Sequence, residues 1–128
     1  MSRRRRRRVL IIVENLPVPF DRRVWLEATA LRDAGYYLGY VGKWHVHQTK
    51  SPLDEQYGFH EYISDGKPYE AWRESRGFAP IPRSNGWFGE LDPHIGPEYS
   101  QLSWGANHAI RMIERGVQTG KPFFVRWD

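Results

Sequence analysis

Residues 31–45 read LRDAGYYLGYVGKWH, and the order of residue types in this stretch predicts the end of a helix followed by a strand. Gly35 suits the position just after a helix, because glycine adopts a left-handed backbone conformation without steric cost. The aromatic and β-branched residues at positions 36–41 are typical of a strand. The stretch therefore predicts a helix packed against a sheet, with its turn at Gly35.

The residues before this stretch predict a helix and a further strand. Apolar side chains recur at helical spacing over residues 22–34, and Asp21 is placed to cap the first turn. Residues 9–13, Val-Leu-Ile-Ile-Val, form a continuous aliphatic run typical of a strand buried on both faces. Strand, helix and strand together make a βαβ unit, whose crossover is expected to be right-handed.

Residues 42–99 are irregular, with many prolines and glycines, and their short apolar pieces at 57–59 and 61–63 are expected to dock on the sheet. Regular patterns return at the end of the chain. Residues 101–115 predict an amphipathic helix, capped by Ser100 and closed by Gly116 and Gly120. Phe-Phe-Val at 123–125 predicts a buried strand.

Together these patterns predict an α/β fold. Its core is a small, partial parallel sheet of about three strands flanked by helices. The strands are expected at residues 9–13, 36–41 and 123–125, and the helices at 22–34 and 101–115. Residues 1–8 are expected to be a basic, disordered leader and residues 9–128 a single domain, as the length of 128 residues suggests. The edges of such a sheet are open, which favours self-association.

The composition excludes several classes of site. The chain has no cysteine, so it has no disulfide, no thiol nucleophile and no thiolate metal site. The formal net charge of +4 is local, because six consecutive arginines run from Arg3 to Arg8 and the rest of the chain carries −2 without them. Such a run favours non-specific contact with nucleic acid. No apolar stretch has the roughly 20 residues of a membrane span, and no export signal is visible, so the cytoplasm is the default location.

Three motifs occur in an order that resembles one enzyme family. Gly35-Tyr36 precedes a strand that ends in Gly-Lys-Trp-His at residues 42–45, although Leu38 stands where the pattern has Ser or Thr. Tyr-Gly-Phe at 57–59 is followed by Glu-Tyr, and Gly-Lys-Pro-Phe-Phe at 120–124 follows the last helix. Residues 31–128 thus resemble an internal part of a sulfatase, of the alkaline-phosphatase-like superfamily.

The beginning of the chain resembles a different family. Residues 9–25, VLIIVENLPVPFDRRVW, are similar to the first strand, loop and helix of retaining glycosyltransferases of the GT-B fold. That resemblance covers about residues 8–36 and overlaps the sulfatase-like part. The sequence is therefore interpreted as a chimaera joined at about residues 31–36.

The sulfatase resemblance implies a site at Lys43 and His45. Sulfatases use a formylglycine whose hydrate attacks sulfur, with calcium polarising the sulfate. Lys43 would stabilise charge on the sulfate oxygens, and His45 would accept a proton from the aldehyde hydrate. Side chains two apart on a strand share a face, so both would point to one pocket.

Other parts of a sulfatase site are missing from this sequence. It contains neither a cysteine nor Ser-x-Pro-x-Arg. The paired aspartates of the family correspond to Glu14 and Asn15, and Glu14 alone is a weak candidate to hold a metal. The chain stops at Asp128, where the family continues with Pro-His-x-Pro. We therefore expect a sulfate ester or another small anion to be the ligand, with no calcium bound and little or no turnover.

Three alternatives stay open. A glycosyltransferase-like lobe would bind a sugar or polyprenyl acceptor at residues 21–25, and the arginine run would make a non-catalytic interaction module. A zinc site would join His45 and His47 to His60 or His94, as nitrogen ligands allow. Three aromatic side chains suit either stacking on a sugar or burial in the core. They are Trp87, Phe88 and Trp104.

Overall fold

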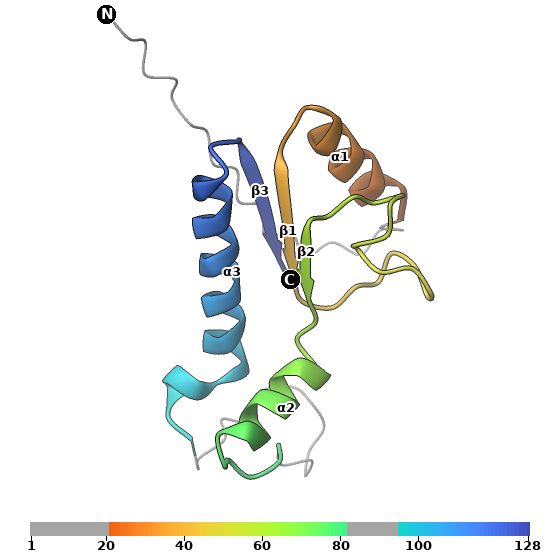
Figure 1. Ribbon diagram of the computed structural model, residues 1–128. Helices are drawn as coiled ribbons and strands as arrows, with labels where there is room; N and C mark the ends of the chain where they lie inside the picture. The colour runs from red at the N-terminus through yellow and green to blue at the C-terminus, as the bar shows by residue number, and fades with distance from the viewer. Residues whose placement is uncertain (1–20, 82–94) are drawn as a thin grey trace, which may run out of the picture.

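A parallel sheet lies between helices in the structure, a computed structural model that describes residues 21–81 and 95–128 (Figure 1). Its three strands are β1 (Tyr37–Val41), β2 (Glu61–Ile63) and β3 (Phe123–Trp127), in the order β2-β1-β3. Both pairs of strands are parallel. The predicted α/β fold with a small parallel sheet is confirmed.

Two longer helices cover the two faces of the sheet. Helix α1 (Asp21–Asp33) lies on one face and α3 (Gln101–Gln118) on the other (Figure 1). Helix α2 (Lys67–Ser75) and the 3-10 turn η1 (Pro97–Tyr99) lie beyond one end of the sheet. Among the described helices, none has the length and apolar character needed to cross a membrane.

Helix α1 ends in a Schellman motif, as the glycine at its end predicts. The N–H of Gly35 donates to the carbonyl of Arg32 at 2.9 Å, and the N–H of Tyr36 donates to the carbonyl of Leu31 at 3.0 Å. Gly35 has φ +82°, the left-handed conformation that this motif requires. Leu31 and Tyr36 both pack against the same hydrophobic cluster, which fixes the angle at which the chain enters β1.

Strand β1 is buried along its whole length because both of its faces are covered. Leu38 and Tyr40 point to the α1 side, where Tyr57 and Phe59 from the following loop also pack. The α3-side cluster is separate. Its buried members are Tyr37, Val41, Ala109, Met112, Phe123 and Val125. Alternation along β1 therefore divides the core into two clusters, and the predicted docking of residues 57–59 is confirmed.

Helix α3 begins where the sequence predicts and ends later. The hydroxyl of Ser100 accepts a hydrogen bond from the N–H of Ser103 at 3.2 Å, which confirms the N-cap. The prediction that Gly116 closes the helix is wrong, because the helix continues to Gln118. A Cβ on Gly116 would lie 2.7 Å from the Cβ of Phe123, so this glycine serves close packing on β3. Gly120, at φ +70°, follows the helix end.

The identity of the strands also needs correction. One of the three described strands, β2, lies where the sequence predicts only an apolar piece docked on the sheet. The expected strand at residues 9–13 lies outside the described residues. Residues 42–99 are less irregular than expected, since they contain β2, α2 and η1. Strand β3 continues to Trp127, two residues beyond the prediction.

Candidate anion-binding site

The Gly-Lys-Trp-His segment, residues 42–45, follows directly on the carboxyl end of the central strand β1. It is held from both neighbouring strands. The N–H of Gly42 donates to the carbonyl of Ile63 at 2.9 Å, and the N–H of Asp128 donates to the carbonyl of Val41 at 3.0 Å. Ligands of open α/β sheets bind outside the carboxyl ends of the strands, so this segment lies where a ligand site is expected.

Gly42 is required by the close approach of β1 and the end of β3. Its φ of +120° is a conformation that other residues rarely adopt. A Cβ at this position would lie 2.5 Å from the carbonyl oxygen of Asp128. Any side chain would push the two strand ends apart, so the glycine fixes the start of the segment against β3.

Burial alternates along the segment that follows. Lys43 and His45 are exposed, whereas Trp44 and Val46 are half-buried and pack against the α1-side cluster. The indole Nε1 of Trp44 donates to the carbonyl of Lys50 at 2.7 Å. Its ring meets that of Tyr40 edge-on, with centroids 5.3 Å apart. Trp44 therefore anchors the segment, and the cation and the imidazole flanking it remain accessible to solvent.

A group of polar side chains that the sequence analysis did not identify links the segment to the ends of β1 and β3. The hydroxyl of Tyr40 donates to the carboxylate of Asp128 and also lies 3.0 Å from the carbonyl oxygen of Lys43. The Nε of Arg126 donates to Asp128 at 3.0 Å, and its guanidinium lies 5.8 Å from the centre of the Tyr40 ring. Burial, followed by the hydrogen bond to Asp128, raises the pKa of Tyr40 well above its usual value of 10. These residues tie the ends of β1 and β3 together.

The charges in this group have a consequence for anions. The carboxylate of Asp128 would repel an anion near Gly42, but Arg126 pairs with it and is itself buried. The pair has little net charge. With the charges of that pair balanced, the first cation after the end of β1 in the sequence is the exposed ammonium of Lys43. The sequence offers a signal for this group. Arg126 and Asp128 follow the strand predicted at 123–125, and if that strand is parallel to residues 36–41, the carboxyl ends of both strands meet at one edge of the sheet.

Of the candidate metal ligands, His45, His47 and His60 lie within the described residues. Within residues 21–81 and 95–128, no three His, Asp or Glu side chains come together to hold an ion. His45, His47 and His60 are therefore not brought together as a group of metal ligands in the described part of the chain. The Nδ1 of His60 accepts from the N–H of Leu38 at 2.9 Å, and the Nδ1 of His47 accepts from the N–H of Thr49 at 3.1 Å. Glu14, Asn15 and His94 lie outside the described residues.

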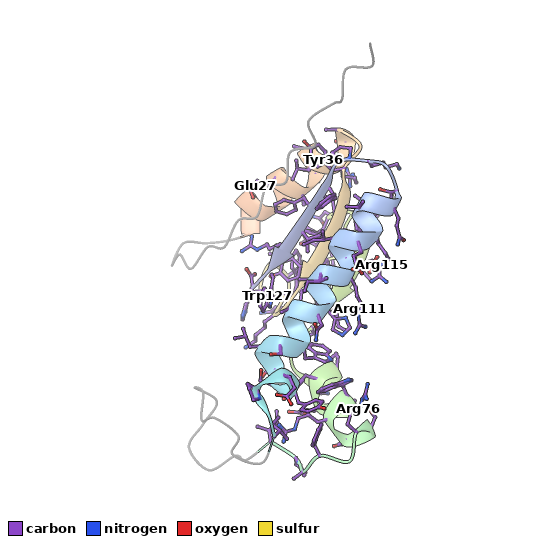
Figure 2. All side chains as sticks on the ribbon, turned by 90° about the vertical axis from the view of Figure 1, so that its left-hand side faces the viewer. Glu27, Tyr36, Arg76, Arg111, Arg115 and Trp127 are labelled. Atoms are coloured by element: carbon purple, nitrogen blue, oxygen red, sulfur yellow. The ribbon has the colours of Figure 1, made fainter. Side chains whose placement is uncertain are left out.

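A second polar cluster lies at the other end of β1. The hydroxyl of Tyr37 donates to the carboxylate of Glu61 on β2, which also pairs with Arg115 of α3. Burial and then the hydrogen bond to Glu61 raise the pKa of Tyr37 to about 12. Arg115 and Arg111 lie one turn apart along one side of α3 (Figure 2). Burial, together with those two arginines, lowers the pKa of His108. This cluster links a helix to two strands.

Other candidate residues have structural roles or lie elsewhere. Trp104 is buried at 5% exposure and packs against Tyr69 and His108, so its place is in the core. Trp87 and Phe88 lie outside the described residues, and nothing is described of the side chains at 21–25. A small hollow on α2 is lined by other residues than Lys43 and His45. These residues are Glu70, Arg73, Glu74, Pro80 and Ile81.

Comparison with known proteins gives no relative. No protein-family model matches the chain, and neither the curated proteins nor the solved structures contain a significant match. The resemblance to sulfatases is therefore one of sequence motifs alone.

Proposed function

We propose that residues 31–128 correspond to part of a sulfatase-type sulfuric ester hydrolase, and that the segment at 42–45 binds a sulfate group without hydrolysing it. The observation that carries the proposal is the placement of this segment. It leaves the carboxyl end of the central strand, with Gly42 packed against Asp128 and Trp44 anchored in the core. Lys43 and His45, on either side of Trp44, lie exposed at the surface.

The chemistry of the two side chains suits a small tetrahedral anion. An ammonium supplies three donors and a full positive charge, and an imidazole supplies one or two donors. Neither group is a nucleophile of the kind a sulfatase uses, and the sequence contains no cysteine and no Ser-x-Pro-x-Arg motif. Catalytic parts of this kind act as a unit, so their loss leaves binding without turnover.

Titration with inorganic sulfate, followed by two-dimensional NMR at constant ionic strength, tests the binding. We expect the amide signals of residues 42–45 to shift with sulfate and not with chloride. Lys43→Ala should weaken the binding by about fivefold, the worth of one exposed charge pair. Lys121→Ala is the matched control, because Lys121 is also exposed and lies beyond the amino end of β3.

Two results would contradict the proposal. If chloride produces the same shifts as sulfate, or if Lys121→Ala weakens binding as much as Lys43→Ala, the segment is not a sulfate site. Hydrolysis of an aryl sulfate in the presence of calcium would show that the chain is an active enzyme and that the missing groups are replaced by others.

A further inference from the structure

The two outer strands of the sheet differ in how they are protected against pairing with another strand. Strand β2 has only three residues, and its Glu61 pairs with Arg115 of α3. Short length and charged side chains are usual means of blocking a sheet edge. Strand β3 has five residues, and its charged side chain, Arg126, is turned to Asp128 and to the ring of Tyr40. Strand β3 is therefore the less protected of the two.

The backbone of β3 presents three residues on its outer side. The carbonyl of Pro122 accepts from the N–H of Tyr37 at 2.8 Å, and the N–H of Asp128 donates to the carbonyl of Val41 at 3.0 Å. Because peptide groups alternate along a parallel ladder, the even-numbered residues of β3 face β1 and the odd-numbered ones face outward. The outward residues are Phe123, Val125 and Trp127. No strand pairs with them among residues 21–81 and 95–128.

Helix α3 carries an exposed apolar stripe on one flank. Its residues recur three or four positions apart, so they share one side of the helix. The stripe consists of Leu102, Ala106, Ile110, Ile113 and Val117. Leu102, Ile110 and Val117 are 70%, 51% and 45% exposed, whereas the apolar side of a surface helix normally faces the core. The stripe therefore borders the face of α3 that packs on the sheet.

The stripe faces the side of the molecule where β3 is the outermost strand. Arg115 reaches Glu61 on β2, which identifies the flank of α3 on the β2 side. Ile113 and Val117 each lie two residues from Arg115, about 200° around the helix. Figure 2 likewise shows Arg115 on the opposite side of α3 from Trp127. Because the strand order is β2-β1-β3, the stripe and the outward groups of β3 border the same side.

We propose that two copies of this chain associate through β3 and α3 about a two-fold axis. The outward residues of β3 are symmetric about Val125. An antiparallel pair of β3 strands centred there sets Val125 against Val125 of the second copy and Phe123 against Trp127 of the second copy. In this register every outward N–H and C=O group of β3 has a partner.

The stripe on α3 is symmetric about the same axis. Gly105 and Gly116 pack on the two ends of β3, where an added Cβ would lie 3.0 Å from the indole nitrogen of Trp127 and 2.7 Å from the Cβ of Phe123. Ile110, midway between the two glycines, is therefore level with the middle of β3. The axis that relates two β3 strands then also passes close to Ile110.

An antiparallel pair of α3 helices centred at Ile110 brings the two stripes together. Ile110 faces Ile110 of the second copy and Leu102 faces Val117. The small Ala106 faces the larger Ile113, which allows the two helices to approach. Every member of the stripe thus meets another apolar side chain, and burial of these exposed side chains favours the association.

The spacing of strands and helices also fits a second copy. Helix α3 lies against both β1 and β3, since a Cβ on Gly39 would meet Met112 and one on Gly116 would meet Phe123. A helix above the gap between these strands lies about one strand spacing, roughly 4.8 Å, from an axis at the outer edge of β3. The two α3 axes are then about 10 Å apart, a distance at which helices pack.

The association is independent of sulfate binding. Because the two β3 strands are antiparallel, the carboxyl ends of the strands in the two copies lie at opposite edges of the joined sheet. The two segments at 42–45 are therefore far apart, and neither completes the other. Loss of association and loss of sulfate binding are separate outcomes.

Sedimentation equilibrium of the full chain tests the association. We expect the unsubstituted chain to form a dimer. Ile110→Lys should raise its Kd at least about thirtyfold, because the substitution sets two like charges against each other on the axis. Gln118→Lys is the matched control, since it adds the same charge at an exposed position of α3 whose two copies would be about 24 Å apart and screened by salt. A chain that stays monomeric at about 1 mM, or equal effects of the two variants, would overturn the proposal.

A mixture of charge variants tests whether Ile110 lies on the axis. Ile110→Glu alone should weaken the association as Ile110→Lys does. An equimolar mixture of the two variants should restore it, because the opposite charges then face each other. If the mixture remains monomeric while the unsubstituted chain forms dimers, α3 does not pair as proposed.

NMR of a mixture of labelled and unlabelled protein tests the strand pairing. Nuclear Overhauser contacts between two molecules are expected from Val125 to Val125 and from Phe123 to Trp127. Two results would contradict the pairing: association without these contacts, or contacts of the outward β3 amides with another part of the same molecule.

Discussion

The phenol of Tyr40 on β1 donates a hydrogen bond to the carboxylate of Asp128, the residue after β3. The same oxygen lies 3.0 Å from the carbonyl of Lys43. One side chain thus joins two neighbouring strand ends to the segment proposed to bind sulfate. Its ring also packs edge-on against Trp44 and Phe59, at centroid distances of 5.3 and 5.6 Å. Tyr40 therefore has a packing role and a hydrogen-bonding role that substitution can separate.

Tyr40→Phe keeps the ring and removes the hydroxyl. The carboxylate of Asp128 then loses a donor while remaining only partly accessible to water, and we expect the free energy of unfolding to fall by about 1–3 kcal/mol. Urea denaturation measures the change. Tyr62→Phe is the control, because Tyr62 packs against the same cluster and no hydrogen bond of its hydroxyl is found among the described residues. If Tyr62→Phe lowers the free energy of unfolding as much as Tyr40→Phe, the hydrogen bond to Asp128 is not the cause of the loss.

Alkaline pH should destabilise the fold through two buried tyrosines, Tyr37 and Tyr40. The pKa of Tyr37 is raised to about 12 in the folded chain, whereas an unfolded tyrosine titrates near 10. The folded state therefore holds its proton where the unfolded state has lost it. This contribution is fully present below about pH 10 and is lost as the pH rises towards 12. Tyr40, whose pKa is also raised, adds to the same effect.

The measurement is the free energy of unfolding at several pH values between about 8 and 11, which lie on both sides of the unfolded pKa. Tyr37→Phe should have lower stability at the lower pH, because it loses the bond to Glu61, and a shallower decline above pH 10. If Tyr37→Phe and the unsubstituted chain decline in parallel, Tyr37 is not a source of the alkaline loss.

Gly42→Ala tests how closely the ends of β1 and β3 approach. Both Gly42 and Gly35 have positive φ, but a Cβ on Gly35 has nothing within 4 Å, whereas one on Gly42 meets the Asp128 carbonyl. Gly35→Ala should cost about 1 kcal/mol from backbone strain alone. Gly42→Ala should cost at least about 1–3 kcal/mol more from overpacking, measured by urea denaturation. Equal losses would mean that the ends of β1 and β3 move apart without a further loss in the free energy of unfolding.

Local patterns in the sequence predict the elements that local physics determines. The helix stop at Gly35 and the cap at Ser100 each depend on residues within one turn, and both are confirmed. Strand β2 has only three half-buried residues, too few to show a period of two, so its pairing with β1 determines its structure. The extension of α3 through Gly116 depends on a contact with Phe123, which propensity alone does not include.

The candidate site also has a part that local sequence patterns predict and a part that depends on distant contacts. The motif at 42–45 identifies Lys43 and His45, and their exposure on either side of Trp44 is consistent with the expected anion site. The support from Tyr40, Arg126 and Asp128 crosses 88 residues between Tyr40 and Asp128 and has no local signature. Its signal is topological, because parallel strands bring their carboxyl ends to one edge.

Gly116→Ala separates helix propensity from packing on β3. In an exposed helix this change would stabilise by about 1 kcal/mol. Here the new Cβ would lie 2.7 Å from the Cβ of Phe123, an atom that cannot move without the strand. We expect a net loss of about 1–3 kcal/mol in the free energy of unfolding, measured by urea denaturation.

Asn107→Ala on the same helix is the control for that substitution. Asn107 is exposed, so its replacement should stabilise by up to about 0.7 kcal/mol through propensity alone. Opposite signs for the two variants would show that α3 packs closely on β3 because position 116 has no side chain. A gain from both variants would mean that the helix can shift outward at little cost, and the close packing of α3 on Phe123 would then contribute little to stability.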